Sequence, residues 1–551
     1  MICSKCGAEN AEEVKFCASC GNEMAMNPEE SVEEIVATEE NVETAAPETE
    51  AAPKKDVLAP VKPLLEKVKP FLEKYKLFVI GAAGLIALIL CISILASIFG
   101  GGNGYDPYKH NISVEIDDGE VVIIYDAKKA KATDLEASYI DEHQASLDGS
   151  VVAILTDAGE LAVVKGTKLT RVAEEVVSFV LSVDGTGLGY VTENDDAYTL
   201  TLYNVKNKKA KTVTEWLSDN NIQIAPNGDS IAYFEQKEDA EEASLMFFKG
   251  SKSTKITSTE VALLGIANNG KYIYAIAEND EGDEILYSYN TKGDRDKIGA
   301  CNTPYVCFNE DHTQILYFNR EDGYKSYIST KGKEGNKIAS SMAVPLTPNS
   351  CEPYSYGRAS TIPTDNLYNK VYVCSTESGN NIWYIRKNTD KSVKLVNGVS
   401  NAVLSEDGDK VYYVDDNELK VLKISKGDNA SDKAKLLAED VDNFVITSDG
   451  KKVYYTSDNS LYCVNAKNGK GKKTIANDDV KSRLYINGKD VVYYIMEGDL
   501  YASKNGSKGK KVLSDVDSVN ATANGIVYVS TDDAYYATKG AKKPSKIWTQ
   551  D

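Results

Sequence analysis

Four cysteines near the N-terminus have the residue type and the spacing of a metal site. Cys3 and Cys6 form one C-x-x-C pair, Cys17 and Cys20 form a second, and a glycine follows each pair. A C-x-x-C turn directs two thiolates at one ion, so two such turns complete a tetrahedral shell of four sulfurs. That donor set suits zinc and leaves no open coordination position. The spacing therefore predicts one structural Zn²⁺ ion held by these four residues, with no catalytic role.

Disulfide bonds are the alternative use of the same cysteines. A segment of about 24 residues buries too little surface to fold without a staple, and disulfide bonds would require an oxidising compartment. With Phe16 before the third cysteine, residues 1–24 resemble the short zinc ribbons found at the N-termini of many bacterial membrane proteins. The resemblance implies a structural metal.

Three segments of different composition follow the cysteines. Residues 25–53 contain nine glutamates and no lysine or arginine, which predicts a flexible acidic tether. Residues 54–76 carry seven lysines beside apolar residues at helical spacing, which predicts a basic amphipathic helix on membrane lipid. Residues 77–99 carry no charge, and as a helix they would reach about 34 Å, enough to cross a bilayer.

The charges beside the uncharged segment predict its orientation. Lysines crowd its N-terminal side, whereas Gly100-Gly101-Gly102-Asn103-Gly104 follows it. By the positive-inside rule, the N-terminus is cytoplasmic and the residues after 104 are extracytoplasmic. Reduced thiolates at Cys3 to Cys20 agree with a cytosolic ribbon. We therefore predict a single-pass membrane protein.

One phrase recurs from residue 105 onward: a polar turn with glycine, a β-rich strand, another polar turn and another strand. Its period is near forty residues, which indicates one supersecondary unit per repeat. Residues 405–446 divide into four short strands joined by hairpin turns, as in a propeller blade. The turn glycines are Gly149, Gly185, Gly228, Gly270, Gly408, Gly450, Gly488 and Gly525.

The repeats predict a mainly β fold, a β-propeller of about ten four-stranded repeats over residues 105–551. The pattern resembles the WD40-like and TolB-like propellers of bacterial envelope proteins. Ten copies leave open one large ring or two in tandem, and the proline-rich segment 340–366 is the expected joint or insertion. Strands expected at 112–116 and 121–125 would complete the last blade and close the ring.

Composition argues against several function classes. The 551 residues include 62 Lys+Arg and 83 Asp+Glu, and the net charge of −21 argues against nucleic-acid binding. Three histidines make histidine-based catalysis an unpromising hypothesis. No catalytic or cofactor-binding residue is predicted outside the zinc ligands. The ectodomain cysteines are expected to be buried thiols, although a bridge between Cys301 and Cys307 is an alternative.

The prediction is a non-enzymatic surface protein whose propeller binds an extracytoplasmic protein or glycan. One alternative is a glycosidase or lyase, which would need acidic groups with displaced pKa values in the central channel. In a second alternative, the propeller is a sensor and the ribbon recruits a cytoplasmic protein. Paired tyrosines such as Tyr412-Tyr413 are expected to fill the sheets, and a stacking surface for sugars or peptides is their functional alternative.

Overall fold

The computed structural model describes residues 109–549, with gaps at 195–196, 269, 302–305, 347–353, 357–358, 363, 377–378, 386–391, 425–430 and 523. The chain divides into two compact units, residues 1–91 and 92–551, and all described residues belong to the second. The predicted ribbon, tether, juxtamembrane helix and membrane span lie outside the described residues. Within the described part, no helix is long and apolar enough to span a membrane.

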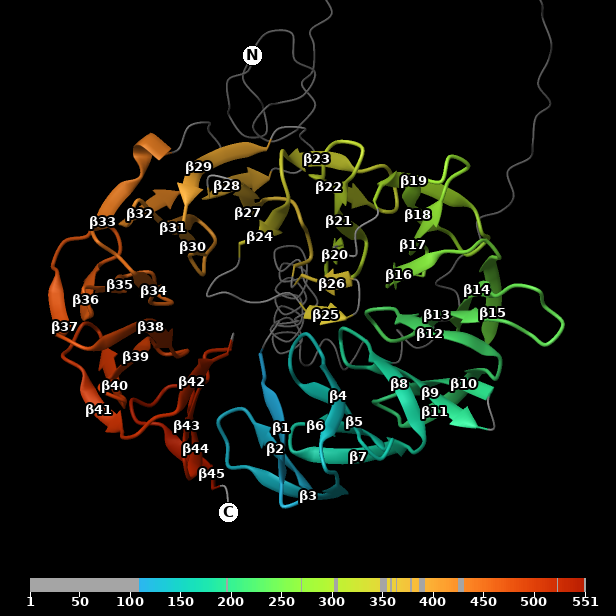
Figure 1. Cartoon of the computed structure of the whole chain (residues 1–551), viewed down its shortest axis with the longest axis horizontal. Coiled ribbons are helices and arrows are strands. Elements are labelled where there is room, and N and C mark those ends of the chain that lie inside the picture. The colour runs from blue at the N-terminus through green and yellow to red at the C-terminus, as the bar shows by residue number, and fades with distance from the viewer. Residues whose placement is uncertain are drawn as a thin grey trace, which may run out of the picture. The chain divides into compact units, whose positions relative to one another are not determined.

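Eleven sheets follow one another around a ring in the described part of the chain (Figure 1). Blades 1 to 4 contain β1 (Ile112–Asp117), β2 (Glu120–Tyr125), β3 (Lys131–Glu136); β4 (Ile140–Ala145), β5 (Val151–Thr156), β6 (Leu161–Lys165), β7 (Lys168–Ala173); β8 (Val176–Leu181), β9 (Gly187–Asn194), β10 (Ala197–Asn204), β11 (Lys209–Thr214); β12 (Leu217–Ile224), β13 (Ser230–Glu235), β14 (Ser244–Lys249) and β15 (Lys252–Thr257).

Blades 5 to 7 include an irregular region. They contain β16 (Ala262–Ile266), β17 (Ile273–Glu278), β18 (Glu284–Tyr289), β19 (Arg295–Ala300); β20 (Val306–Phe308), β21 (Gln314–Asn319), β22 (Lys325–Thr330), β23 (Asn336–Ala339), with β25 (Tyr354–Tyr356) and β26 (Ala359–Thr361) added; and β24 (Ala343–Pro345), β27 (Lys370–Thr376), β28 (Gly379–Ile385) and β29 (Val393–Val399).

Blades 8 to 11 are regular four-stranded sheets. They contain β30 (Asn401–Leu404), β31 (Lys410–Asp415), β32 (Glu418–Lys423), β33 (Lys435–Ala438), with the 3-10 helix η2 (Ser431–Lys433) before β33; β34 (Asn443–Ile446), β35 (Lys452–Ser457), β36 (Ser460–Asn465), β37 (Lys473–Ala476); β38 (Val480–Ile486), β39 (Val491–Met496), β40 (Asp499–Lys504), β41 (Lys510–Leu513); β42 (Ser518–Ala521), β43 (Val527–Thr531), β44 (Ala534–Thr538) and β45 (Ser545–Thr549).

The ring corrects the predicted count, which is eleven blades and not about ten. Each of the ten predicted repeats starts at the turn between the first and second strands of a blade. Blade 1 has three strands, β1-β2-β3, and no such turn among the described residues, so its sequence lacks the turn phrase that marked the other ten copies, eight of them with a glycine. The count missed it for that reason.

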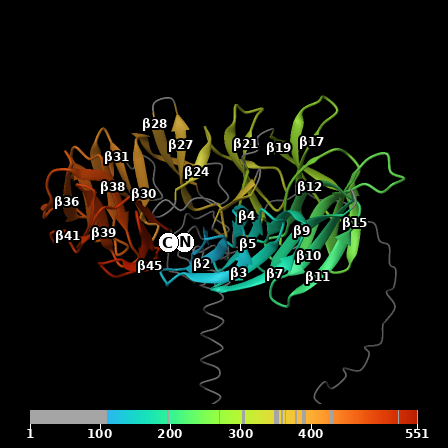
Figure 2. The same cartoon turned by 60° about the horizontal axis from the view of Figure 1, so that its bottom comes forward.

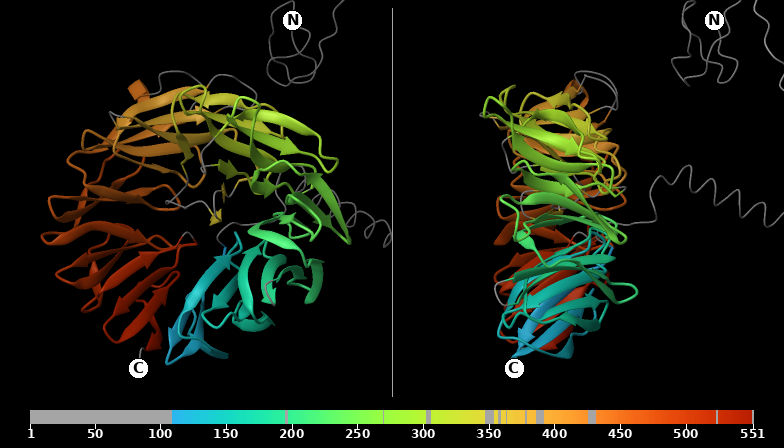
Figure 3. Two further views of the ribbon diagram at one scale, coloured as in Figure 1. Left: turned by 45° about the vertical axis from the view of Figure 1, so that its right-hand side comes forward. Right: turned by 90° about the vertical axis from the view of Figure 1, so that its right-hand side faces the viewer.

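Ring closure also differs from the prediction. β1 and β2 form a hairpin with each other and do not complete the last blade, because β42 to β45 already form a full sheet. The two sheets lie side by side (Figures 1 and 3). Trp548 Nε1 donates a hydrogen bond to Asp117 Oδ2 at 2.9 Å, and Ala130 N donates to Ile547 O at 2.9 Å. Side-chain packing and these bonds, with no shared strand, join the first blade to the last in a single ring.

Blade stacking explains why the second strands read as continuous apolar runs. Each sheet is covered on both faces by its neighbours, so residues pointing either way are buried. The predicted filling role of the tyrosines is confirmed, since both rings of each pair are at most 1% exposed at Tyr412-Tyr413, Tyr454-Tyr455 and Tyr493-Tyr494. The alternative stacking surface is wrong for these three pairs.

The two faces of the ring carry different connections, as the tilted view in Figure 2 helps to follow. Because the strands of a blade are antiparallel, its first–second and third–fourth turns share one face, which we call the turn face. The second–third turns and the connections between blades lie on the opposite, crossover face. Lys109, the first described residue, lies on the turn face, where its carbonyl accepts a hydrogen bond from Asn524 Nδ2 at 3.4 Å.

The segment 340–366 adds strands to the inner edge of blade 6. After β24, the chain leaves blade 7, and β26 pairs in parallel with β20 while β25 pairs with β26 (Figure 1). The chain then returns to blade 7 at β27. A six-stranded sheet results, and its two extra strands extend toward the centre of the ring.

Candidate functional site: a polar pocket between blades 7 and 8

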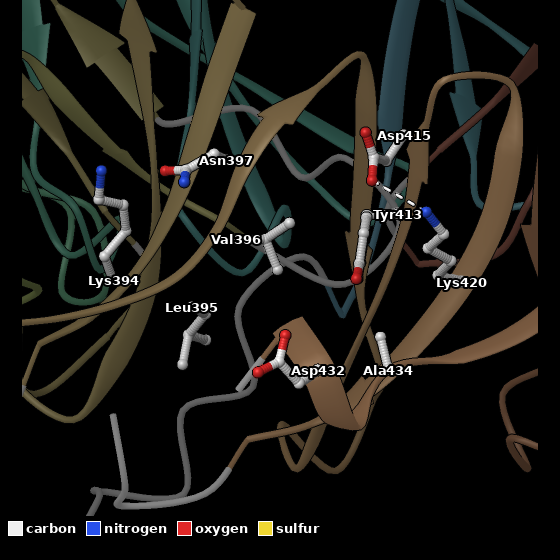
Figure 4. A pocket seen from close by; sticks show the side chains of 9 residues that line it. All are labelled: Lys394, Leu395, Val396, Asn397, Tyr413, Asp415, Lys420, Asp432 and Ala434. Atoms are coloured by element: carbon white, nitrogen blue, oxygen red, sulfur yellow. Dashed lines mark hydrogen bonds and ion pairs between the residues drawn. The ribbon is translucent and has the colours of Figure 1, made fainter. Parts of the chain in front are cut away.

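A pocket of about 410 Å³ lies between the outermost strand of blade 7 and the second and third strands of blade 8. Figure 4 shows its side chains from β29, β31, β32 and the segment around η2. The lining residues are Lys394, Leu395, Val396, Asn397, Tyr413, Asp415, Lys420, Asp432 and Ala434.

Local structure explains how polar groups reach the pocket. Lys394 and Asn397 of β29 are exposed, whereas Leu395 and Val396 between them are buried. Bulges in the pairing of β28 with β29 interrupt the simple alternation of a strand and allow two adjacent buried residues. Asp432 comes from η2, in the connection between the third and fourth strands of blade 8.

The charges of the pocket are only partly paired. Lys420 Nζ lies 2.9 Å from Asp415 Oδ2 and 2.8 Å from Glu418 Oε2, and hydrogen bonding to Glu418 first, then to Asp415, raises the pKa of the lysine. Burial raises the pKa of Tyr413, which remains a neutral phenol.

Lys394 lines the pocket from β29, but its ammonium lies over the Trp383 ring, 5.6 Å from the centroid, and points away from the other polar groups (Figure 4). In the described part of the chain, Asp432 forms no ion pair. The pocket thus presents one carboxylate with hydrogen-bonding capacity left for a ligand, beside the Tyr413 phenol and the paired Lys420.

The predicted zinc ligands Cys3, Cys6, Cys17 and Cys20 lie outside the described residues. Among the residues that the structure does describe, no cluster of three or more His, Cys, Asp or Glu side chains has the arrangement of a metal site. The sequence did not predict the pocket, because its residues come from three strands and a short helix of two blades and form no motif.

Cys307, Cys374 and Cys463 form no disulfide bond, so the alternative bridge from Cys301 to Cys307 is not formed. Cys374 and Cys463 are buried thiols, as predicted, whereas Cys307 is only partly buried. Burial raises the pKa of Cys374 to about 12, which keeps it protonated and unreactive at neutral pH. Cys351 lies outside the described residues.

Among the described carboxyl groups, Glu310 has a strongly raised pKa, whereas hydrogen bonds lower the pKa of Asp322 and of Asp407. Burial, followed by the charges of Asp365 and Asp311, raises the pKa of Glu310 to about 7, while Lys370 opposes the shift. Glu310 lies in the first turn of blade 6, on the turn face, and does not line the pocket. It is the residue on which the enzymatic alternative would depend.

His312 fixes the inserted strands to the ring. Its ring is buried and stacks on Phe308 with centroids 4.4 Å apart. Nδ1 lies 3.0 Å from Ile266 O and Nε2 lies 2.9 Å from Thr361 Oγ1 of β26. A neutral imidazole satisfies both contacts by donating to the carbonyl and accepting from the hydroxyl.

We expect His312 to make the ring less stable in acid. Burial lowers its pKa to about 4 from an ordinary 6.5, so the unfolded chain binds this proton first as the pH falls. The folded state therefore loses stability between pH 6.5 and pH 4, by about 2 kcal/mol at pH 4.5. In His312→Gln, an amide keeps a donor and an acceptor without titrating, so urea unfolding at pH 7 and pH 4.5 should show a smaller acid loss. Equal losses in both proteins would contradict this role.

Comparisons with known proteins bear on both parts of the chain. Residues 2–24 match the model of a zinc-ribbon domain. No curated protein matches the chain. Among solved structures, "Crystal structure of the eukaryotic initiation factor" is 8% identical, covering 79% of this chain and 98% of that one, with a TM-score of 0.32.

Two propeller structures are also similar to this chain. TolB from Acinetobacter baumannii is 13% identical over 51% of this chain and 78% of its own, with a TM-score of 0.26. The β-propeller domain of the Trilobed protease from Pyrococcus furiosus is 15% identical over 62% of this chain and 99% of its own, with a TM-score of 0.21. The matched ribbon family and the described sheets together give an N-terminal zinc ribbon and an eleven-bladed β-propeller.

Proposed function

We propose that this chain is a single-pass membrane protein whose extracytoplasmic propeller binds a glycan in the pocket between blades 7 and 8, without enzymatic activity. The carrying observation is the Asp432 carboxylate, which lines the pocket without an ion partner among the described residues, beside the Tyr413 phenol and the Lys420 ammonium. Such groups can hydrogen-bond the hydroxyls of a glycan, and about 410 Å³ falls in the usual range for small ligands. The zinc ribbon is proposed as a cytoplasmic structural module on the other side of the uncharged segment 77–99.

Membrane anchoring is supported by the sequence of residues 54–104, and the place where the chain joins the ring bears on which face lies toward the bilayer. Only residues 100–108 separate the proposed span from Lys109, and nine residues extend to about 30 Å at most. Since Lys109 lies on the turn face, that face is the one held toward the bilayer in this proposal.

Reversing one charge in the pocket tests the binding proposal. The full chain, purified in detergent, is immobilised and exposed to fractionated bacterial envelope polysaccharide. Asp432→Lys should weaken capture by about tenfold or more, because the loss of a charged hydrogen bond costs about 1.5 kcal/mol or more. Glu439→Lys makes the same charge change at an exposed residue in the connection after blade 8 and is the matched control.

Three outcomes would count against the proposal. Equal weakening by Asp432→Lys and Glu439→Lys would place binding in general electrostatics, and unchanged capture by Asp432→Lys would place it elsewhere. If the wild-type protein shortened the glycan with time and the Glu310→Gln variant left it intact, that result would instead establish the enzymatic alternative.

A further inference from the structure

The turns of the propeller are segregated by charge. We call the described connections between third and fourth strands the outer turns. Together they contain fifteen lysines and only four acidic residues. Lys128, Lys206, Lys331, Lys470 and Lys542 represent blades 1, 3, 6, 9 and 11. The acidic residues of these turns are Asp126, Asp294, Glu334 and Asp432. The described outer turns therefore have net positive charge in blades 1, 3, 6, 9, 10 and 11, no charge in blades 2 and 4, and balanced charge in blades 5 and 8. We call this set of lysines at the periphery of the turn face the lysine ring.

The crossover face has the opposite character. Its described second–third turns carry seventeen acidic residues and two basic ones, Lys237 and Arg320. The described connections between blades add eleven acidic residues and no lysine or arginine. On the turn face, the first turns near the centre are mostly acidic as well, so the positive charge is confined to the periphery of that face.

Local structural needs do not account for this segregation. Aspartate and asparagine suit tight turns because they tolerate positive φ, but both kinds of hairpin have that need: Asp416 and Asn505 have φ values of 52° and 55°. Lysines on an outermost strand discourage pairing with another sheet, yet that need applies to strands and not to the turns before them. The distribution separates one face from the other, which suggests a long-range electrostatic role.

We infer that the lysine ring of the outer turns docks on the anionic headgroups of the bilayer that holds this protein, an inference that rests on the proposed anchoring. The chain joins the ring at Lys109, on the same face as these lysines. A lysine near an anionic membrane contributes about 1 kcal/mol, and the interaction falls off within a Debye length of about 8 Å. The acidic crossover face is repelled by the same surface, so docking has one favoured orientation.

Lysine footprinting on the full chain tests the inference. The protein is reconstituted into vesicles of phosphatidylcholine alone or with about 30% phosphatidylglycerol, and a membrane-impermeant acetylating reagent is added outside. In the anionic vesicles at low salt, we expect Lys206, Lys331 and Lys470 to react about threefold more slowly, with protection lost at about 0.5 M NaCl. Lys237, on the crossover face with 68% of its side chain exposed, is the internal control and should not change.

The outcomes separate this inference from the proposed anchoring. Loss of the chain from neutral vesicles after alkaline carbonate extraction would overturn anchoring itself. Retention there, with equal lysine reactivity in both vesicle types, would overturn only the docking. If Lys237 were protected as strongly as the outer-turn lysines, the protein would adsorb on the membrane without a favoured orientation. If the outer-turn lysines were protected only by soluble polyglycerol phosphate added to neutral vesicles, they would bind a polymer and not the bilayer. Either result overturns the inference.

Discussion

Replacing Cys17 and Cys20 together by serine should remove the bound zinc from the full chain and unfold residues 2–24. The four-thiolate shell predicted for Cys3, Cys6, Cys17 and Cys20 loses half of its ligands, and a segment this small has no core to replace them. Zinc binding supplies about 10 to 16 kcal/mol to folding in comparable sites, so this is the largest single effect that we predict. Elemental analysis should find one zinc per chain in the wild type and none in the variant.

The propeller supplies the control for this experiment. Cys463→Ser changes a buried thiol of β36 and should leave the zinc content unchanged. The double variant should keep the urea midpoint of the propeller, because the sheets have hydrophobic clusters of their own, built from described residues of the blades. Retention of a full equivalent of zinc by the double variant would exclude the predicted ligand set.

Periodicity made the propeller predictable, and its irregular parts were not. Turn glycines such as Gly185 and Gly228 recur because the first turn of most blades needs a residue with positive φ at the same position. The same sequence pattern therefore appears many times along the chain. Blade 1 has no first turn among its described residues, and β25 and β26 occur once. A feature that occurs once has no period. In addition, β26 pairs in parallel with β20, which is distant in sequence, and local patterns do not encode such a pairing.

The candidate site was unpredictable for a related reason. Leu395 of blade 7 and Lys420 of blade 8 both line the pocket, and each looks like many other strand residues until the blades are placed side by side. The zinc ligands, in contrast, lie within eighteen residues of one another, so the chain itself brings them together. In the sequence, His312 was notable only as one of three histidines. Its structural role could not be predicted, because its contact with Thr361 depends on the inserted strands.

A repeated turn motif links local sequence to the closure of the whole ring. In blade 3, Ser182 Oγ donates to Asp184 Oδ1 at 2.8 Å, and Gly187 N donates to Ser182 Oγ at 2.9 Å. Asp184 N then donates to Pro226 O of the next blade at 3.0 Å. Gly488 N donates to Gly525 O at 2.8 Å between blades 10 and 11. Neighbouring first turns thus approach each other closely enough for backbone hydrogen bonds.

Gly228→Ala should therefore destabilise the propeller by about 2 to 5 kcal/mol, which combines strain from positive φ with overpacking against backbone. Gly228 has a φ of 66°, and a Cβ there would overlap the backbone nitrogen of Gly187. The atom that it meets belongs to the backbone of a neighbouring blade and cannot rotate away. Relief would require the first turns of blades 3 and 4 to separate, which would break the hydrogen bond from Thr186 Oγ1 to Asn227 O.

Gly250→Ala isolates the steric part of this effect. Gly250 lies in the outer turn of the same blade with a φ of 64°, but nothing lies within 4 Å of the position that a Cβ would occupy. Alanine there meets only the cost of positive φ, about 1 to 2 kcal/mol. Urea unfolding of both variants should place Gly228→Ala well below Gly250→Ala in midpoint. If the two midpoints coincide, the first turns are not in tight contact in solution, and blade-to-blade stability must come from the buried sheets alone.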